Sequence, residues 1–150
     1  MATTKKKKTE AVAVEKKPAK YWYAVGRRKT SIAQVRLFED DRLKPEETSI
    51  VNGKSFGQYF PTETLQNSAL APLKVMNALG FNMTVVVRGG GVKSQSEAVS
   101  LGVARALVLN NPEIKKALRE AKLMTRDARA VERKKPGLKK ARKAPQWAKR

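Results

Sequence analysis

The residues best placed to do chemistry in this 150-residue chain are closely spaced cations, which can neutralise phosphate groups. The segment from Arg126 to Arg150 holds eleven Lys or Arg residues against two acids, Asp127 and Glu132. Its few large apolar residues are isolated from one another by charges, so burial could not offset the entropy of ordering this segment alone. We therefore predict an extended basic tail over residues 126–150 that becomes ordered on a polyanion.

A second basic motif is the run Gly26-Arg-Arg-Lys-Thr-Ser31, which places three cations beside a glycine at the end of an expected strand. The glycine would let the backbone approach a ligand closely, and the hydroxyls of Thr30 and Ser31 would add neutral phosphate donors. The alternative is a solvated turn with no ligand. Its position at a strand end favours binding to RNA phosphate.

A third motif, Arg88-Gly-Gly-Gly91, lies between an expected strand and an expected helix. Such a loop can cradle phosphate, because backbone N–H groups and the helix dipole attract an anion. In a phosphotransferase, Lys93 and Ser94 would be phosphate ligands, but no carboxylate can be nominated as the base or the metal ligand. The structural alternative is that the glycines only allow close packing of strand against helix. No catalytic residue is predicted.

The overall composition points to a nucleic-acid partner. The chain has 33 basic and 13 acidic residues, a net charge of +20, and neither Cys nor His. These counts argue against disulfides, zinc ribbons and bound cofactors or metals, and the basic arms lack the apolar face that a membrane-surface helix would bury. No apolar run suggests secretion or membrane insertion. We expect a cytoplasmic protein with no membrane partner and no small-molecule substrate.

The elements that must position these motifs follow from apolar spacing and breakers. Residues 21–25, 32–37, 49–51 and 83–88 read as strands, with Asn52-Gly53 as a turn and residues 54–59 as a brief helical turn. Gly26 is expected to end the first strand, and the apolar run 85–87 predicts a strand buried on both faces. Residues 63–70 and 73–79, divided at Pro72, are expected to be short helices. A longer helix is predicted over 95–109, and another after an Asn111 cap, with Pro112 as its first residue.

These elements predict one α+β domain over residues 21–125. Residues 1–20 would be a disordered Lys-rich leader, and residues 126–150 the basic tail. The domain is large enough for one modest core.

Four stretches together resemble the universal S-nine family of the small ribosomal subunit, in its bacterial or organellar form. They are Gly26-Arg-Arg-Lys-Thr; Val51-Asn-Gly-Lys with Tyr59-Phe-Pro61; Gly89-Gly-Gly with Gln95, Ala98, Gly102 and Ala104-Arg-Ala-Leu107; and the segment from Leu123 to Arg150. The resemblance implies an α+β fold like the second domain of small-subunit ribosomal protein five. That fold has a four-stranded mixed sheet backed by helices, and it is shared with one class of small-molecule kinases.

The resemblance also implies a place in the head of the small subunit, with the tail reaching the peptidyl site. The expected partners are small-subunit ribosomal RNA, transfer RNA in that site and neighbouring head proteins. A cytoplasmic ribosome is preferred to an organellar one. Two rivals remain: a phosphotransferase of the related fold, and a nucleic-acid-binding protein or chaperone outside the ribosome.

The candidate site residues combine the motifs and the resemblance. Those expected to bind ribosomal RNA in the domain are Arg27, Arg28, Lys29, Thr30, Arg88, Gly90, Gly91, Lys93 and Gln95. Those in the tail are Arg126, Arg129, Arg133, Lys134, Lys135, Lys139, Lys140, Arg142 and Lys143. Trp147, Lys149 and Arg150 are expected to contact transfer RNA, with Trp147 stacking on a base or sugar. Departures from the family pattern occur at Lys93-Ser94, Ser96-Glu97, Ser100, Pro136 and Trp147-Ala148.

Overall fold

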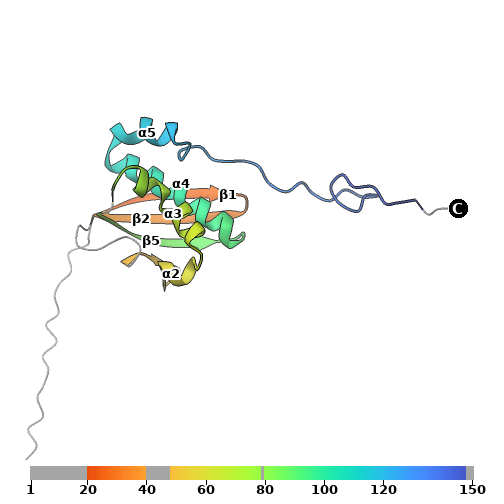
Figure 1. The fold of residues 1–150 in the computed structure, drawn as a ribbon, viewed down its shortest axis with the longest axis horizontal. Coiled ribbons are helices and arrows are strands. Elements are labelled where there is room, and N and C mark those ends of the chain that lie inside the picture. The colour runs from red at the N-terminus through yellow and green to blue at the C-terminus, as the bar shows by residue number, and fades with distance from the viewer. Residues whose placement is uncertain (1–19, 40–47, 79, 148–150) are drawn as a thin grey trace, which may run out of the picture.

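The computed structural model of the protein describes residues 20–39, 48–78 and 80–147, in which one sheet is backed by helices (Figure 1). Its strands are β1 (Tyr21–Arg28), β2 (Ser31–Glu39), β3 (Ile50–Val51), β4 (Lys54–Ser55) and β5 (Phe81–Arg88). Its helices are α2 (Phe56–Tyr59), α3 (Glu63–Val75), α4 (Val92–Asn110) and α5 (Lys115–Glu120), with a 3-10 turn at Pro112–Ile114 before α5. The predicted α+β class is confirmed.

The sheet is mixed, in the order β1-β2-β5-β3-β4. Only the β3–β5 pair is parallel; the other neighbours are antiparallel. The prediction of four strands is wrong by one, because Asn52-Gly53, with φ angles of 49° and 77°, folds residues 54–55 back onto β3. The helical turn expected over 54–59 therefore starts only at Phe56. The likeness to the second domain of small-subunit protein five stays a prediction.

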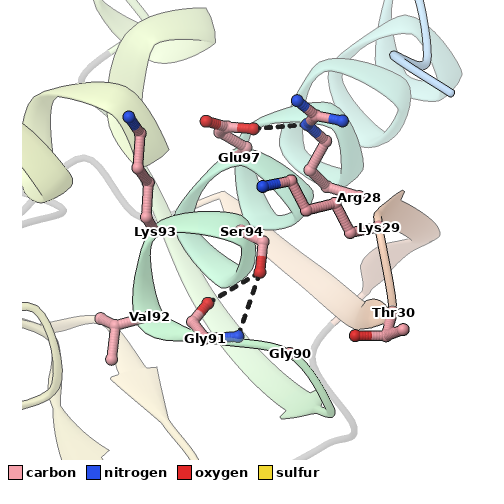
Figure 2. A pocket seen from close by; sticks show the side chains of 9 residues that line it. All are labelled: Arg28, Lys29, Thr30, Gly90, Gly91, Val92, Lys93, Ser94 and Glu97. Atoms are coloured by element: carbon pink, nitrogen blue, oxygen red, sulfur yellow. Dashed lines mark hydrogen bonds and ion pairs between the residues drawn. The ribbon is translucent and has the colours of Figure 1, made fainter. Parts of the chain in front are cut away.

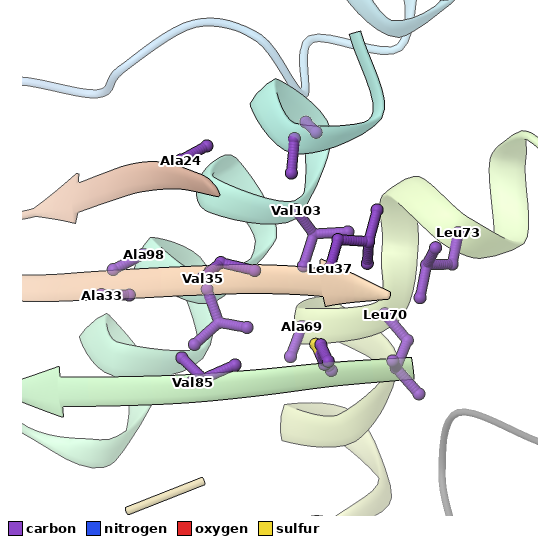
Figure 3. Close-up of a cluster of buried hydrophobic side chains, with 14 of the residues drawn as sticks. Ala24, Ala33, Val35, Leu37, Ala69, Leu70, Leu73, Val85, Ala98 and Val103 are labelled. Atoms are coloured by element: carbon purple, nitrogen blue, oxygen red, sulfur yellow. The ribbon is translucent and has the colours of Figure 1, made fainter. Parts of the chain in front are cut away.

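The core lies between one face of the sheet and the helices. α4 packs against β1 and β2, and α3 packs against α4. The strand predicted over 32–37 is confirmed: in β2, Ala33, Val35 and Leu37 are fully buried, whereas the residues between them are exposed. Figure 3 shows these side chains meeting Val85 of β5 and Val103 of α4. The sheet thus has one covered face and one open face.

The prediction that β5 is buried on both faces is wrong. Val85 and Val87 are 1% and 4% exposed, but Val86 between them is 39% exposed. An unbroken apolar run carries no polar marker of the outward face, so its period could not be read from the sequence.

The first strand does not stop at Gly26. β1 continues to Arg28, with Gly26 paired to Ala33, and the turn consists of Lys29 and Thr30. A Cβ atom at Gly26 would lie 1.8 Å from the backbone oxygen of Ala98 and 2.6 Å from the nitrogen of Gly102. This glycine therefore allows α4 to approach the strand, and the role predicted for it in ligand approach has no support in its surroundings.

Two helical predictions also need correction. α3 is one helix through Pro72, which is itself buried beside Leu70 and Leu73. Burial of this apolar face offsets the one backbone hydrogen bond that proline removes. α4 begins at Val92, three residues before its predicted start. The Asn111 cap is confirmed, since its Oδ1 accepts a hydrogen bond from the Glu113 N–H at 3.0 Å.

Candidate nucleic-acid interface

Two of the predicted motifs, about sixty residues apart in sequence, meet at one end of the sheet. The β1–β2 turn and the glycine loop after β5 line a cavity of about 430 Å³ (Figure 2). Its lining residues are Arg28, Lys29, Thr30, Gly90, Gly91, Val92, Lys93, Ser94 and Glu97. The sheet order places β1 and β5 on either side of β2, so their adjacent ends bring the two motifs together.

The glycines of the loop serve close packing of these two turns. Gly89 and Gly90 have φ angles of 71° and 65°, which favour glycine. A Cβ at Gly89 would lie 2.5 Å from the Thr30 oxygen, and one at Gly90 would lie 2.0 Å from Ser31 Oγ. Gly91, which caps the start of α4, has open space around it. The packing explanation therefore holds for the first two glycines, whereas at Gly91 a side chain would meet no neighbouring atom.

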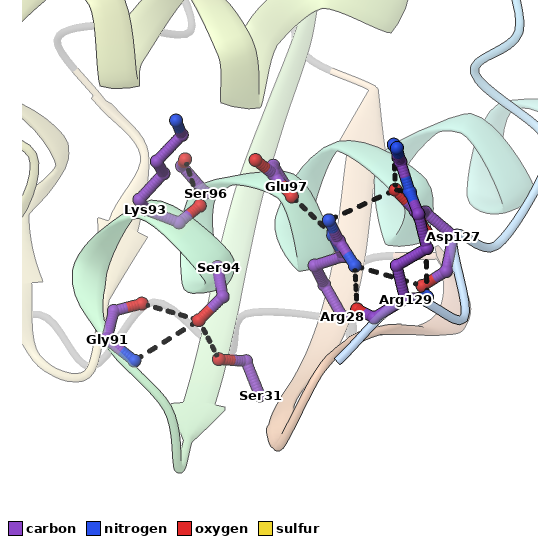
Figure 4. Close-up of polar contacts among 9 residues, drawn as sticks. All are labelled: Arg28, Ser31, Gly91, Lys93, Ser94, Ser96, Glu97, Asp127 and Arg129. Atoms are coloured by element: carbon purple, nitrogen blue, oxygen red, sulfur yellow. Dashed lines mark hydrogen bonds and ion pairs between the residues drawn. The ribbon is translucent and has the colours of Figure 1, made fainter. Parts of the chain in front are cut away.

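The two serines of the site face each other inside the protein. Ser31 Oγ lies 2.8 Å from Ser94 Oγ and 3.1 Å from the Gly89 carbonyl oxygen. Ser94 Oγ accepts from the Gly91 N–H at 3.2 Å (Figure 4). Since Ser31 is 1% exposed and Ser94 is 8% exposed, they fasten the glycine loop to β2. The prediction of Ser31 as a phosphate donor is wrong for this reason.

Arg28 is committed to contacts within the protein. Its Nε donates to Glu97 Oε2 at 2.6 Å, its Nη2 pairs with Asp127 Oδ2 at 3.0 Å, and its Nη1 donates to the carbonyl oxygens of Asp127 and Arg129 (Figure 4). The Arg28 side chain is only 14% exposed. It joins β1 to α4 and to the start of the tail. The sequence does not indicate this role, because Arg28 lies between two other cations.

The remaining cations at this end of the sheet are available to a ligand. Arg27, Lys29, Arg88 and Lys93 are exposed, and none forms an ion pair with another described residue. Glu97, the only carboxylate lining the cavity, is already paired with Arg28. The cavity therefore offers an anion two lysines and no unpaired acid, which suits phosphate binding and gives no support to a phosphotransferase base.

Gln95 belongs to a polar chain that sequence reasoning missed. Its Nε2 donates to the Gly89 carbonyl oxygen at 3.0 Å, and its Oε1 accepts from the Tyr59 hydroxyl at 2.8 Å. Asn52 lies 3.4 Å from the same hydroxyl and bonds both the N–H and the carbonyl of Val87. The Asn-Gly pair was recognised only as a turn, although it also ties β3 to β5. Binding of RNA by Gln95 stays a prediction, and its amide is already used.

The tail leaves the domain beyond α5 and runs away from it (Figure 1). Near its start, Asp127 is held by Arg129: hydrogen bonds from the Arg129 side chain and N–H, then the charges of Arg129 and Arg28, lower the Asp127 pKa to about 2. From residue 128 to 147 only Leu138 and Ala141 are even half-buried. This exposure agrees with the scarcity of apolar residues in the sequence.

The tail is not uniformly extended within its described part. Arg142 forms two hydrogen bonds with the Glu132 carboxylate, at 3.0 and 2.5 Å. The Lys139 N–H also donates to the Lys143 carbonyl at 2.7 Å, and Gly137 turns with a φ of 76°. These contacts close a loop over residues 132–142, whose exposed cations besides the paired Arg142 are Arg133, Lys134, Lys135, Lys139 and Lys140. A count of charges could not show that one of the two acids pairs with a residue ten positions away.

The predicted transfer-RNA tip is described only at Trp147, whose side chain is 93% exposed. Lys149 and Arg150 lie outside the described residues, as do the first 19 residues of the leader. No helix among the described residues is long and apolar enough to cross a membrane. The described part of the chain also contains no cluster of three or more acids that could hold a metal ion.

Comparison with known proteins identifies the family. A family model described as ribosomal protein S9/S16 matches residues 26–150. The chain is 51% identical over 128 residues to small ribosomal subunit protein uS9 of Cytophaga hutchinsonii, covering 85% of this chain and 96% of that protein. It is 45% identical over 131 residues to the uS9 protein of Thermus thermophilus, covering 86% and 98%. It is also 48% identical to the uS9m protein of Eremothecium gossypii, but spans only 44% of that longer chain. The chain therefore belongs to the ribosomal protein S9/S16 family, a family of structural, non-enzymatic proteins.

Proposed function

We propose that this chain is a structural constituent of the small ribosomal subunit and that it binds ribosomal RNA in the head through two separate basic surfaces. The first is the turn surface, defined as Arg27, Lys29, Arg88 and Lys93 at one end of the sheet. The second is the tail loop, residues 132–142. The observation that carries the proposal is that the cations of the turn surface, and those of the tail loop other than Arg142, are exposed without carboxylate partners among the described residues, whereas Arg28 and Arg142 have such partners.

The mechanism is neutralisation of phosphate. Each Lys or Arg placed on a phosphate releases condensed counterions, and this release drives binding that weakens steeply with salt. The Arg28 contacts hold the start of the tail against the domain, so the tail leaves from a fixed point. Beyond that point the tail has almost nothing to bury in the free protein and becomes ordered as RNA surrounds it.

The tip of the tail is proposed to reach transfer RNA in the peptidyl site. Support comes from the family resemblance and from Trp147, whose ring is exposed and can stack on a base or sugar. Two cations, Lys149 and Arg150, follow Trp147 in the sequence and are separated from the tail loop by Pro145. The tail loop would anchor the tail to ribosomal RNA, while the tip contacts a transfer RNA that binds and dissociates.

The test compares two variants of equal charge. In the first, Lys134, Lys135, Lys139 and Lys140 of the tail loop are changed to Ala. In the control, four exposed cations on and beside α5 are changed to Ala: Lys115, Lys116, Arg119 and Lys122. Affinity for small-subunit ribosomal RNA is measured across a range of salt concentrations. The tail variant should lose about 0.7–0.9 in the slope of log affinity against log salt for each phosphate contact removed, and the control much less.

Equal losses in the two variants would mean that only the net charge of the chain matters. No loss in the tail variant would remove the tail loop from the interface. Either result would contradict the proposal, whereas failure of the unaltered protein to enter small subunits would contradict the ribosomal role itself.

A further inference from the structure

The face of the sheet that the helices leave open carries an unusual set of exposed side chains. We define the open sheet face by seven residues: Tyr21, Tyr23, Ile32, Arg36, Ile50, Val86 and Arg88. Its tyrosines are 51% and 45% exposed, and its three aliphatic residues lie between 39% and 46%. α4 packs on the opposite face, over the alternate residues of β1 and β2. Single exposed apolar residues are ordinary, but a contiguous group marks a surface that binds something.

The strand register shows that these residues are contiguous. Tyr23 pairs with Arg36, Arg36 with Thr84, and Thr84 with Ile50, which makes one row across four strands. Ile32 pairs with Arg88 in a second row nearer the turn surface, and Gln34 pairs with Val86 between them. Paired residues have Cβ atoms about 5 Å apart, so each row is continuous.

The first row and the Tyr21–Phe38 pair beside it combine aromatic rings with a guanidinium group. The Arg36 Cζ lies 5.7 Å from the centre of the Tyr21 ring, and that ring lies 5.8 Å from the ring of Phe38. Arg36 therefore sits between two tyrosines, one beside it and one opposite it on β1. Flat aromatic and guanidinium surfaces of this kind are the groups on which unpaired bases stack.

The charge of the open sheet face selects the class of partner. Its charged residues, Arg36 and Arg88, form no ion pair with another described residue. Glu39 is the only acid in the strands that the structure describes, and it alternates with Phe38, so it belongs to the other face. An all-cationic face with exposed rings complements a polymer that offers both phosphates and flat bases. RNA supplies both, whereas a protein partner would need acids aligned with two separate rows.

We propose that the open sheet face binds unpaired nucleotides of RNA, with Tyr23 stacking on a base and with Arg36 and Arg88 holding phosphates on either side. This proposal rests on the proposed function, because ribosomal RNA is the RNA that it would bind. The turn surface and the tail loop bind RNA through charge, and the open sheet face would add base stacking to these contacts. Arg88 lies where the open sheet face and the turn surface join, so one RNA strand could pass from one to the other.

The test is a competition for incorporation into small subunits assembled from purified components. Isotopically labelled wild-type protein competes with Tyr23→Thr, which keeps a β-branched residue in the strand but removes the ring, or with Tyr23→Phe, which keeps the ring. Loss of one stacked base corresponds to roughly 5- to 100-fold weaker binding. Tyr23→Thr should be under-represented by that factor, and Tyr23→Phe should be incorporated about equally with wild type. Thermal melting checks that both variants fold.

A second pair of variants covers the case in which Tyr23→Thr does not fold. Arg36→Gln should compete poorly while Arg36→Lys, which keeps the charge, should lose less. Irradiation of subunits carrying p-azidophenylalanine at Tyr21 or Tyr23 then identifies the neighbour by cross-linking. Cross-links to RNA support the proposal. Equal incorporation of the ring-deleted variant, or cross-links to a protein alone, would overturn it while leaving the ribosomal role intact. If wild type itself is not incorporated, the proposed function fails first.

Discussion

Replacing Arg28 by Gln should destabilise the domain and loosen the start of the tail, although Arg28 lies in a run of cations that reads as an RNA-binding motif. The substitution removes the ion pair with Glu97 at 2.6 Å and the pair with Asp127 at 3.0 Å. It also removes two hydrogen bonds to backbone carbonyls, at 2.7 and 3.2 Å. The Arg28 side chain is 14% exposed, so water cannot fully replace these partners.

The magnitude follows from the Glu97 contact. A hydrogen bond between charged groups contributes about 1.5–3 kcal/mol when buried. Because 34% of the Glu97 side chain is exposed and can be hydrated once the pair is broken, we reduce this to about 1–2 kcal/mol. For a domain of this size, that loss in the free energy of unfolding lowers the melting temperature by roughly 5–15 °C.

The matched control is Arg27→Gln, which removes the same charge from the adjacent residue. Arg27 is exposed and has no ion-pair partner among the described residues, so its loss should change stability by less than about 0.5 kcal/mol. Thermal melts give the stability difference, and the rate of trypsin cleavage after Arg126 and Arg129 reports on the tail. If the two variants melt at the same temperature and their tails are cleaved at the same rate, the assignment of Arg28 as a structural link is refuted.

Three further outcomes are expected. Gly26→Ala should lower the free energy of unfolding by about 3 kcal/mol or more, because its Cβ would lie 1.8 Å from the Ala98 oxygen. Gly91→Ala, where the Cβ would meet open space, should lower it by less than about 1 kcal/mol. Denaturant titration of the two variants measures this difference. The pKa of Asp127 is lowered to about 2, so its carboxylate should keep the contact with Arg129 at any pH above its ordinary pKa of 3.8 and lose it as the pH falls through 2. NMR of the Arg129 N–H measures this transition, and Asp127→Asn is the pH-independent control. Deleting residues 148–150 should leave subunit assembly unchanged and weaken transfer-RNA binding to the peptidyl site in filter assays; an assembly defect with normal transfer-RNA affinity would contradict a separate role for the tip.

Local patterns with a marked polar side were readable from the sequence. The alternation of β2 indicates its buried face because Gln34 and Arg36 differ in polarity from the apolar residues beside them. Asn111-Pro112 marks the start of the 3-10 turn before α5 because capping is a local interaction. The predictions for Val86 and Pro72 are wrong for the opposite reason. Whether a valine faces outward, or a proline is accommodated in a helix, depends on packing that only the assembled fold supplies.

The candidate site divides in the same way. The sequence showed that cations gather in three places, and the fold brings two of those places together around one cavity. It could not show which cations have partners. Arg28 and Arg142 look like their neighbours in the sequence, yet each is bonded to a carboxylate 69 or 10 residues away. Pairing over such distances is fixed by topology, and charge counts contain no information about it.

The contact between β1 and α4 has a consequence for how the chain folds during synthesis. β1 pairs with β2 directly after it, but the helix that covers it is encoded some seventy residues later, as the 69-residue separation of Arg28 and Glu97 shows. Loops of this length close slowly, and contacts between distant segments slow folding. A nascent chain therefore exposes the apolar side of its first hairpin until α4 has emerged from the ribosome that makes it. The basic tail follows α4 in the sequence, so its cations emerge only after the helix that covers this apolar surface.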